Sequence, residues 1–309
     1  MGITAKQLER RKTQPYTSGS DLAAVCGCDP FRSAYDVWLV RRGMVDDARL
    51  EVAHAHNRAM QMGTMLEPVI LDWASQRLGK LLRNQRRVNR PAMLACHLDA
   101  ITGRTEGRDD PGDTVEAKSS GMTWALSEQW GDTDDDYPTD EIPMRIVPQA
   151  YAGMICNGSR RCWVPTILGG RGFRMYLVEY RKSVADELVR RNLAFIGGHV
   201  ETRIPPEDCK PSMEFVRALR RQPEQVREIP VEMVSAWRDV KRKRLELEKA
   251  EDEAKRDIWL ELEGCDGGTI DGELVVTNKM QTRKAYTVAE SSFAVLREVK
   301  RPTGCGFVS

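Results

Sequence analysis

The sequence of 309 residues has no long apolar run and almost no net charge, and each absence excludes a class of protein. No stretch approaches the roughly 18 consecutive apolar residues that a membrane-spanning helix needs. Lys and Arg number 47 and Asp and Glu number 46, so nucleic-acid binding would require a local basic patch rather than the field of the whole molecule. The N-terminal residues lack the apolar segment of a secretory signal. We therefore expect a cytoplasmic protein without a membrane span.

Cysteine is present without the spacing of a metal knuckle. Of eight cysteines, only Cys26 and Cys28 are close in the sequence, as C-x-C rather than C-x-x-C. The scattering of the others disfavours the four-cysteine ligation of an iron–sulfur cluster. We interpret the cysteines as small apolar residues of a reduced interior.

The apolar periodicity predicts a mixed α/β fold. It indicates two short helices within 17–43 and one amphipathic helix within 57–79, which either begins close to Glu67 or bends at Pro68. The next elements that we expect are strands over 80–88, 92–101 and 113–119, a helix over 143–158, a hairpin over 162–180 and a helix over 182–200. This order favours a mixed sheet with helices packed on it.

The C-terminal part differs in composition from the rest. Residues 231–263 predict one long charged helix. The segments 270–276 and 284–288 then suggest a hairpin, with Asp271-Gly272 as a type I′ turn. We divide the chain into a core, residues 1–227, and a helix-plus-hairpin appendage, residues 228–309.

Two short segments carry the residues that could do chemistry. C-H-L-D ends an apolar predicted strand at Asp99, and V-E-A-K follows at 115–118. Because side chains alternate along a strand, Glu116 and Lys118 point the same way, and a neighbouring strand can bring Asp99 alongside. A hard cation such as Mg²⁺ relieves the repulsion between such carboxylates and activates water, while Lys118 can orient the nucleophile. The alternative is a surface ion pair between Glu116 and Lys118.

Two more side chains are candidates for the same site. Glu67 precedes Ile70 and Leu71 by three and four residues, so it lies beside the apolar stripe of its helix and can face the sheet. Its alternative role is a carboxylate that stabilises a helix N-terminus. Gln149, in the helix after the strands, can bind water or phosphate, although such a residue more often lies on a helix surface.

These residues belong to an ordered series of motifs. In that series the sequence resembles the YqaJ-like viral recombinase nucleases, relatives of lambda exonuclease within the PD-(D/E)XK superfamily, and the resemblance implies a restriction-endonuclease-like sheet flanked by helices. The matching motifs are S-G-S-D at 18–21, P-F-R-S-A-Y-D-V-W at 30–38, M-G-T-M-L-E-P-V-I at 62–70, L-D at 98–99, V-E-A-K at 115–118 and P-Q-A-Y-A-G-M at 148–154.

The resemblance also implies a role for each matching residue. The metal ligands would be Asp99, Glu116 and the backbone carbonyl of Ala117, with Glu67 as an outer acid. Lys118 would be the catalytic lysine and Gln149 a supporting glutamine. In a pocket for the 5′-phosphate of DNA, the matching residue is Ser20, and the candidates for an arginine without a clear match are Arg11, Lys12 and Arg32.

The activity that the resemblance implies is a Mg²⁺-dependent nuclease, with Mn²⁺ as a substitute. It would degrade one strand of double-stranded DNA ends from 5′ to 3′ and leave a 3′ overhang for a single-strand annealing protein of the RecT type. Processive relatives form rings around DNA, which implies a homo-oligomer and, by analogy, a trimer. A phage or prophage in a bacterial host would encode such a protein.

Two other functions remain open at this stage. One keeps the fold but changes the reaction, to that of a structure-dependent or single-strand-specific DNA nuclease such as the RecB-like relatives. The other is a non-catalytic adaptor that uses the charged helix over 231–263. The complete set of acids and lysine argues against the adaptor.

Two runs of charge bear on DNA binding. A basic run without an acid consists of Lys80, Arg83, Arg86, Arg87 and Arg90. It predicts phosphate contacts or, equally, a strand edge guarded by positive charge. Residues 132–141 are acidic and predict a solvated loop.

Overall fold

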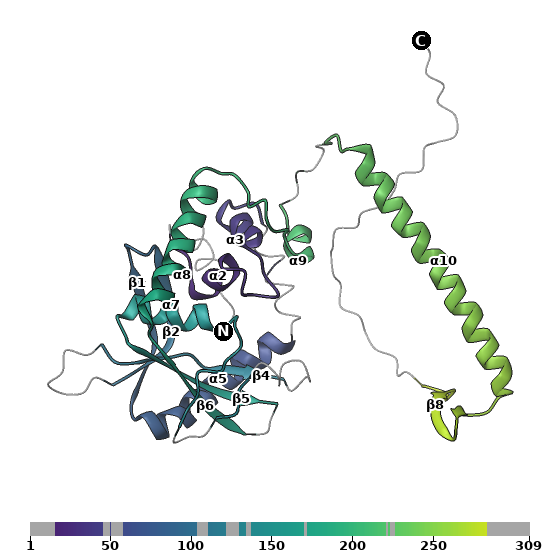
Figure 1. Ribbon diagram of the computed structural model, residues 1–309, viewed down its shortest axis with the longest axis horizontal. Coiled ribbons are helices and arrows are strands. Elements are labelled where there is room, and N and C mark those ends of the chain that lie inside the picture. The colour runs from purple at the N-terminus through teal and green to yellow at the C-terminus, as the bar shows by residue number, and fades with distance from the viewer. Residues whose placement is uncertain are drawn as a thin grey trace, which may run out of the picture. The chain divides into compact units, whose positions relative to one another are not determined.

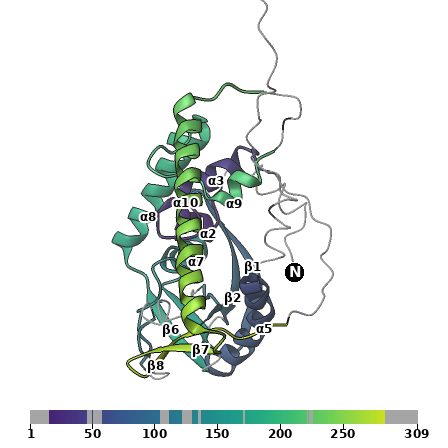
Figure 2. The ribbon, with the colours of Figure 1, turned by 90° about the vertical axis from the view of Figure 1, so that its right-hand side faces the viewer.

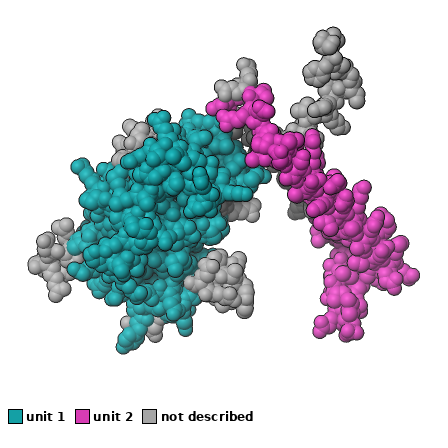
Figure 3. Space-filling view, turned by 45° about the horizontal axis from the view of Figure 1, so that its top comes forward, with its two compact units in different colours: residues 1–220 teal, residues 221–309 magenta. Residues whose placement is uncertain are grey.

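The computed structural model describes residues 16–45, 50, 58–103, 111–121, 130–133, 137–169, 172–220, 222 and 226–282. It divides the chain into two compact units, residues 1–220 and residues 221–309 (Figure 3). The sequence placed this boundary between residues 227 and 228. No helix among the described residues is long and apolar enough to cross a membrane.

Two capped helices open the described part of the chain. Helix α2, Gly19–Val25, begins at Ser18, whose hydroxyl accepts a hydrogen bond from the Asp21 amide while the Asp21 carboxylate accepts one from the Ser18 amide. Helix α3, Ala34–Arg41, begins with the same reciprocal arrangement at Ser33 and Asp36. Such capping boxes satisfy amide groups that have no partner within the helix. The two short helices are therefore confirmed.

Helix α5 spans Arg58–Leu78 without interruption and contains Pro68. The prediction that the helix begins close to Glu67 is therefore wrong. Its buried stripe consists of Ile70, Leu71 and Ala74. Because residues three and four apart share a helix face, these side chains hold α5 against the sheet.

The central sheet has six strands and is mixed (Figure 1). Its strands are β1, Leu81–Asn89; β2, Leu94–Thr102; β3, Thr114–Val115; β4, Lys118–Ser120; β5, Arg161–Leu168; and β6, Phe173–Glu179. Strand β2 pairs antiparallel with β1 and β3, β5 pairs parallel with β3 and β4, and β6 pairs antiparallel with β5. The mixed α/β fold is confirmed.

The strand that was expected over 113–119 is divided into β3 and β4 at Glu116 and Ala117. Both pieces pair in one register with β5, and the Glu116 amide still donates to the Trp163 carbonyl. The Ala117 amide instead donates to the Asp99 carboxylate, at 2.8 Å. A side chain thus replaces a strand carbonyl as the acceptor, and this contact accounts for the break.

Strand β2 is irregular at the same level. The pairing of β1 with β2 skips Asn84 and Asp99, and Asn84 has φ of +55°. On one side of Asp99, Leu98 packs in the main core cluster, whereas Ala100 packs on the other face of the sheet with Leu71. Simple alternation of side chains along this strand therefore ends at Asp99.

Helices cover both faces of the sheet. Helix α7, Val147–Asn157, ends at Gly158, whose φ of +77° is the left-handed conformation of a helix C-cap. Helix α8, Lys182–Phe195, continues as the π-helical segment η1, Ile196–Glu201. Side chains of α2, α7 and α8 form the main core with one face, and α5 covers the other (Figure 2).

The C-terminal unit consists of a long helix and a hairpin. Helix α10 spans Val231–Leu262, and strands β7, Gly267–Ile270, and β8, Glu273–Thr277, pair antiparallel. Asp271 and Gly272 have φ of +51° and +85°, as a type I′ turn requires. The helix and the turn are confirmed, but the first strand begins at Gly267 and its partner is β8. The segment 284–288 lies outside the described residues.

Candidate active site

Asp99 and Glu116 lie side by side where β2 meets the gap between β3 and β4. The register that pairs Ala100 with Val115 and Ile101 with Thr114 extends to place Asp99 opposite Glu116. Residues opposite each other in an antiparallel pair have Cβ atoms about 5 Å apart. The predicted meeting of two carboxylates from separate strands is thus present.

Lys118 bridges the carboxylates to the helix behind them. Its ammonium group donates to Glu116 Oε1 at 2.7 Å and to Gln149 Oε1 at 3.0 Å. The Gln149 amide nitrogen in turn donates to the Arg145 carbonyl at 3.3 Å. Side chains of Lys118 and Glu116 are only 20% and 16% exposed, so this is not the exposed ion pair considered as the alternative.

The electrostatics of the site reflect crowded negative charge. Burial raises the pKa of the Asp99 carboxyl well above its usual range, and the Glu116 and Glu67 carboxylates raise it further against the opposing effects of Lys118 and the Ala117 amide. Burial lowers the pKa of Lys118, but Glu116 and Asp99 more than offset that effect, so the pKa of the lysine is raised. Lys118 therefore remains an ammonium, and one ammonium does not neutralise the surrounding acids.

The Glu67 carboxylate affects the pKa of Asp99 but does not form a metal-binding group with Asp99 and Glu116. In the parts of the chain that the structure describes, no three His, Cys, Asp or Glu side chains form a group that could hold a metal ion by themselves. The charge of Glu67 still raises the pKa of Asp99, so Glu67 lies near the two carboxylates but outside shared ligand distance.

The predicted 5′-phosphate segment borders the same helix. Gly19 lies against α7, where an added Cβ would stand 3.5 Å from the Gln149 Cα atom. Ser20 follows it and is exposed, with its hydroxyl 3.1 Å from that of Ser18. The S-G-S-D segment is thus brought next to Gln149 by the packing of α2 on α7.

Arg32 is held close to that segment. Its guanidinium forms an ion pair with Asp21 at 2.8 Å, yet its Nε atom is buried without a hydrogen-bond partner. Arg32 also lines a cavity of about 450 Å³. Arg11 and Lys12, the other candidates for this role, lie outside the described residues.

Arg145 is a site residue that the sequence interpretation missed. Its positive charge acts to lower the pKa of Lys118, its carbonyl holds Gln149, and its Nε atom is buried without a hydrogen-bond partner. A buried N–H without a partner is costly unless another group binds it. The only signal in the sequence was its position four residues before Gln149, in the turn that precedes α7.

The basic run lies on β1 and directly before and after it, at the edge of the sheet. Arg83 forms an ion pair with Asp72 at 2.6 Å, and Arg87 donates to the Asn157 side chain at 3.2 Å. Lys80, Arg86 and Arg90 are exposed. Part of the run therefore has a structural role, and the described part of the acidic loop includes an ion pair between Asp140 and Arg181.

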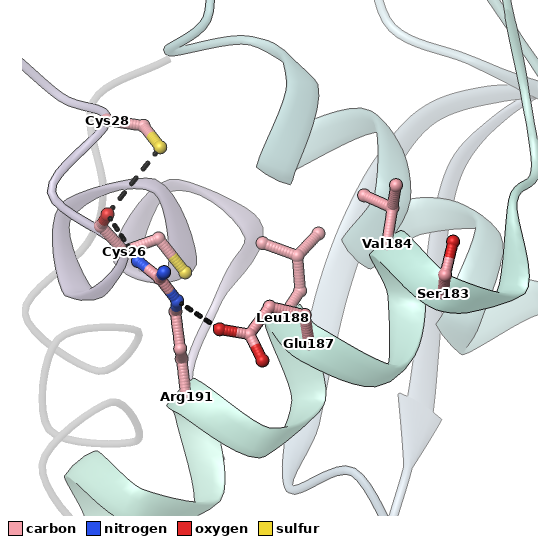
Figure 4. A pocket seen from close by; sticks show the side chains of 7 residues that line it. All are labelled: Cys26, Cys28, Ser183, Val184, Glu187, Leu188 and Arg191. Atoms are coloured by element: carbon pink, nitrogen blue, oxygen red, sulfur yellow. Dashed lines mark hydrogen bonds and ion pairs between the residues drawn. The ribbon is translucent and has the colours of Figure 1, made fainter.

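A second cavity, of about 370 Å³, lies apart from Asp99 (Figure 4). It is lined by Cys26, Cys28 and residues of α8, among which Arg191 points toward Glu187. Burial raises the pKa of Cys26 to about 11, so this thiol stays protonated and is a poor nucleophile and metal ligand. We therefore assign no nucleophilic or metal-binding role to Cys26 in this pocket.

Comparisons with known proteins find one matching family and several similar proteins. Residues 7–160 match the family described as YqaJ-like viral recombinase domain. The chain is similar to YqaJ of Bacillus subtilis (strain 168), with 21% identity over 291 residues that cover 90% of this chain and 85% of that one. An alkaline exonuclease from Laribacter hongkongensis has 17% identity and a TM-score of 0.45 over 65% of this chain and 94% of that one. A phage related exonuclease from Haemophilus somnus 129PT has 13% identity and a TM-score of 0.39 over 61% and 95%.

Proposed function

Because residues 7–160 belong to the YqaJ-like viral recombinase domain family, as the motifs predicted, we propose that this phage-type nuclease degrades one strand of double-stranded DNA. In this proposal it starts at a 5′ end and leaves a 3′ single-stranded overhang. The observation that carries the proposal is the cluster of Asp99, Glu116 and Lys118 at the break between β3 and β4. Two carboxylates and an ammonium at an interrupted strand serve hydrolysis of a phosphodiester better than they serve stability.

The donor set fits a hard divalent cation, Mg²⁺ or Mn²⁺. Asp99, Glu116 and the Ala117 carbonyl would hold it, with Glu67 as an outer acid. The raised pKa of Asp99 supports this fit, because burial and the neighbouring Glu116 and Glu67 carboxylates both disfavour its charged form, and a bound cation would offset both effects. When bound, such an ion lowers the pKa of a coordinated water and neutralises charge on a phosphate.

The protein's own residues position the reactants. Glu116 and Gln149 fix the Lys118 ammonium, which can orient the attacking water and stabilise negative charge on the phosphate oxygens. The unpartnered Nε atom of Arg145 offers a second donor for a phosphate oxygen. The Arg145 carbonyl holds the Gln149 side chain and thereby keeps Lys118 in place.

DNA would contact the surfaces on either side of this cluster. The exposed basic residues on and beside β1, Lys80, Arg86 and Arg90, would bind the duplex backbone. Ser20 and Arg32 would bind the 5′-phosphate, with help from Arg11 and Lys12. We further propose a homo-oligomer, a trimer by analogy, that supplies overhangs to a single-strand annealing protein.

The experiment is a digestion with the full chain in Mg²⁺. The substrates are a linear duplex labelled at either the 5′ or the 3′ end of one strand, a closed circular duplex and single-stranded DNA. We expect early release of the 5′ label as mononucleotide, slow loss of the 3′ label and an intact circle. Digestion of the circle, or faster digestion of single-stranded DNA, would replace this function with a structure-dependent or single-strand-specific nuclease. No digestion of any substrate would reject a nuclease.

A further inference from the structure

Helix α10 (Figure 1) carries exposed apolar side chains along most of its length. Apolar residues of this helix recur at spacings of three, four or seven residues and so form a stripe on one helix face. They are Met233, Trp237, Val240, Leu247, Ala254 and Ile258. Val240 and Leu247 are 66% and 71% exposed. A helix of 32 residues is roughly 48 Å long, and such a stripe on it is typical of a helix that pairs with another.

The charges of α10 form two adjacent blocks of opposite sign. Residues 238–244 contain five basic residues and one acid, a net charge of +4. Residues 245–253 contain five acids and one lysine, a net charge of −4. Ion pairs within the helix join Arg242 to Asp239, Arg244 to Glu248 and Lys255 to Glu251, and all of these side chains are still at least 49% exposed. The blocks therefore remain available to a partner with the reverse order of charge.

We propose that α10 pairs with α10 of a second copy of this chain, and that the two helices run antiparallel. A parallel pair would set the basic block against the basic block and the acidic block against the acidic one. An antiparallel pair sets each block against its opposite. No other partner needs to be invoked, because the same helix supplies both halves of the match.

The stripe itself selects the same arrangement. Two of its positions are occupied by Arg244 and Glu251, which lie equally far from the midpoint between Leu247 and Glu248. An antiparallel pair centred there places Arg244 level with Glu251 of the second copy. It also places Trp237 level with Ile258 of the second copy. The polar positions thus meet as opposite charges and the apolar positions meet as apolar contacts, which fixes register as buried polar pairs do in coiled coils.

Charge exchange on the full chain tests this pairing. The mass of the assembly is measured by sedimentation equilibrium in about 0.1 M salt, where attraction between exposed charges persists over about 10 Å. Arg244→Glu alone and Glu251→Arg alone each set like charges together, and we expect each to halve the mass of the wild-type assembly. The double variant restores opposite charges in the reverse order and should restore the wild-type mass. Arg242→Glu, a matched change off the stripe, should leave the mass unchanged.

Other outcomes overturn the antiparallel pair. Unchanged masses in both single variants mean that contacts between Arg244 and Glu251 of two copies do not hold the assembly together, and they reject the pair. Failure of the double variant to recover, with helix content preserved by circular dichroism, also rejects it. The test is independent of the proposed nuclease, because it measures the mass of the assembly and not the digestion of DNA.

Discussion

Two lysine–glutamate ion pairs in this chain differ chiefly in their surroundings. Lys118 and Glu116 have side chains that are 20% and 16% exposed, whereas those of Lys255 and Glu251 are 52% and 63% exposed. The first pair also contacts Gln149 and lies beside Asp99, while the second bridges one turn of α10. The same two residue types therefore make a closely bonded cluster where they are mostly buried and an ordinary helix contact where they are exposed.

The largest difference between the pairs should appear in catalysis. Lys118→Ala removes the ammonium that orients water and stabilises charge, and we expect nucleotide release from linear duplex to fall by about 10²- to 10⁴-fold. Lys255→Ala is the matched control and should retain the wild-type rate. Initial rates at saturating DNA measure both. Similar rates for the two variants would remove the distinction between the pairs.

Arg145 should matter less than Lys118, because in the proposed function it contacts only a phosphate oxygen, whereas Lys118 also orients the attacking water. We expect Arg145→Ala to reduce kcat/KM by about 10- to 100-fold, the cost of one charged hydrogen bond. Arg145→Lys should recover part of the loss, since it keeps the charge but not the planar group. Steady-state rates over a range of duplex concentrations separate the variants. An unaltered kcat/KM in Arg145→Ala would show that the buried Nε atom has no role toward substrate.

The crowded charge of the buried pair should also be visible in stability. Since the pKa of Asp99 is raised in the folded state, its protonated form stabilises the fold at low pH, and this contribution is lost as pH rises through the raised value. In the absence of metal, Asp99→Asn should therefore increase the free energy of unfolding at pH 8 by about 1–2 kcal/mol. The gain should vanish near the pKa of an unperturbed aspartate, about 4.

Urea unfolding in EDTA at several pH values measures this difference. The side-chain oxygen of Asn can still accept a hydrogen bond from the Ala117 amide. The variant therefore removes the charge of residue 99 and leaves that hydrogen bond possible. A variant that is less stable than the wild type at pH 8 would contradict the repulsion between Asp99 and Glu116.

The smallest effect is expected at the exposed pair. Lys255→Ala removes an ion pair between solvated side chains of α10, and such pairs contribute little to stability. We expect no measurable change in the midpoint of urea unfolding or in helix content by circular dichroism. A clear loss of helix would mean that α10 depends on this contact more than its exposure implies.

Much of the fold could be predicted because its signals are local. Ser18 and Ser33 cap the N-termini of helices α2 and α3. Gly158 ends helix α7, and Asp271-Gly272 forms the hairpin turn, in each case with a positive φ. These features depend on neighbours a few residues away. Short-range chemistry therefore sufficed for α2, α3, the end of α7 and the C-terminal turn.

The geometry of the site could be predicted only in part. Asp99, Glu116 and Lys118 were found from strand alternation and motifs, but the break after β3 depends on a hydrogen bond from Ala117 to a side chain on another strand. The irregular pairing at Asn84 and the burial of the Arg145 Nε atom without a hydrogen-bond partner likewise arise only in the folded chain. No pattern of neighbouring residues encodes them.

The most direct test of the central claim compares Glu116→Gln with Glu251→Gln as Mg²⁺ is titrated into a digestion of linear duplex. Each variant replaces one lysine-paired glutamate by its uncharged isostere, one buried and one exposed. We expect Glu251→Gln to show the same dependence of rate on Mg²⁺ as the wild type. We expect Glu116→Gln to release nucleotides at least about 10²-fold more slowly than the wild type at every Mg²⁺ concentration. Nucleotide release by Glu116→Gln within about twofold of the wild type, well inside that loss, would contradict it.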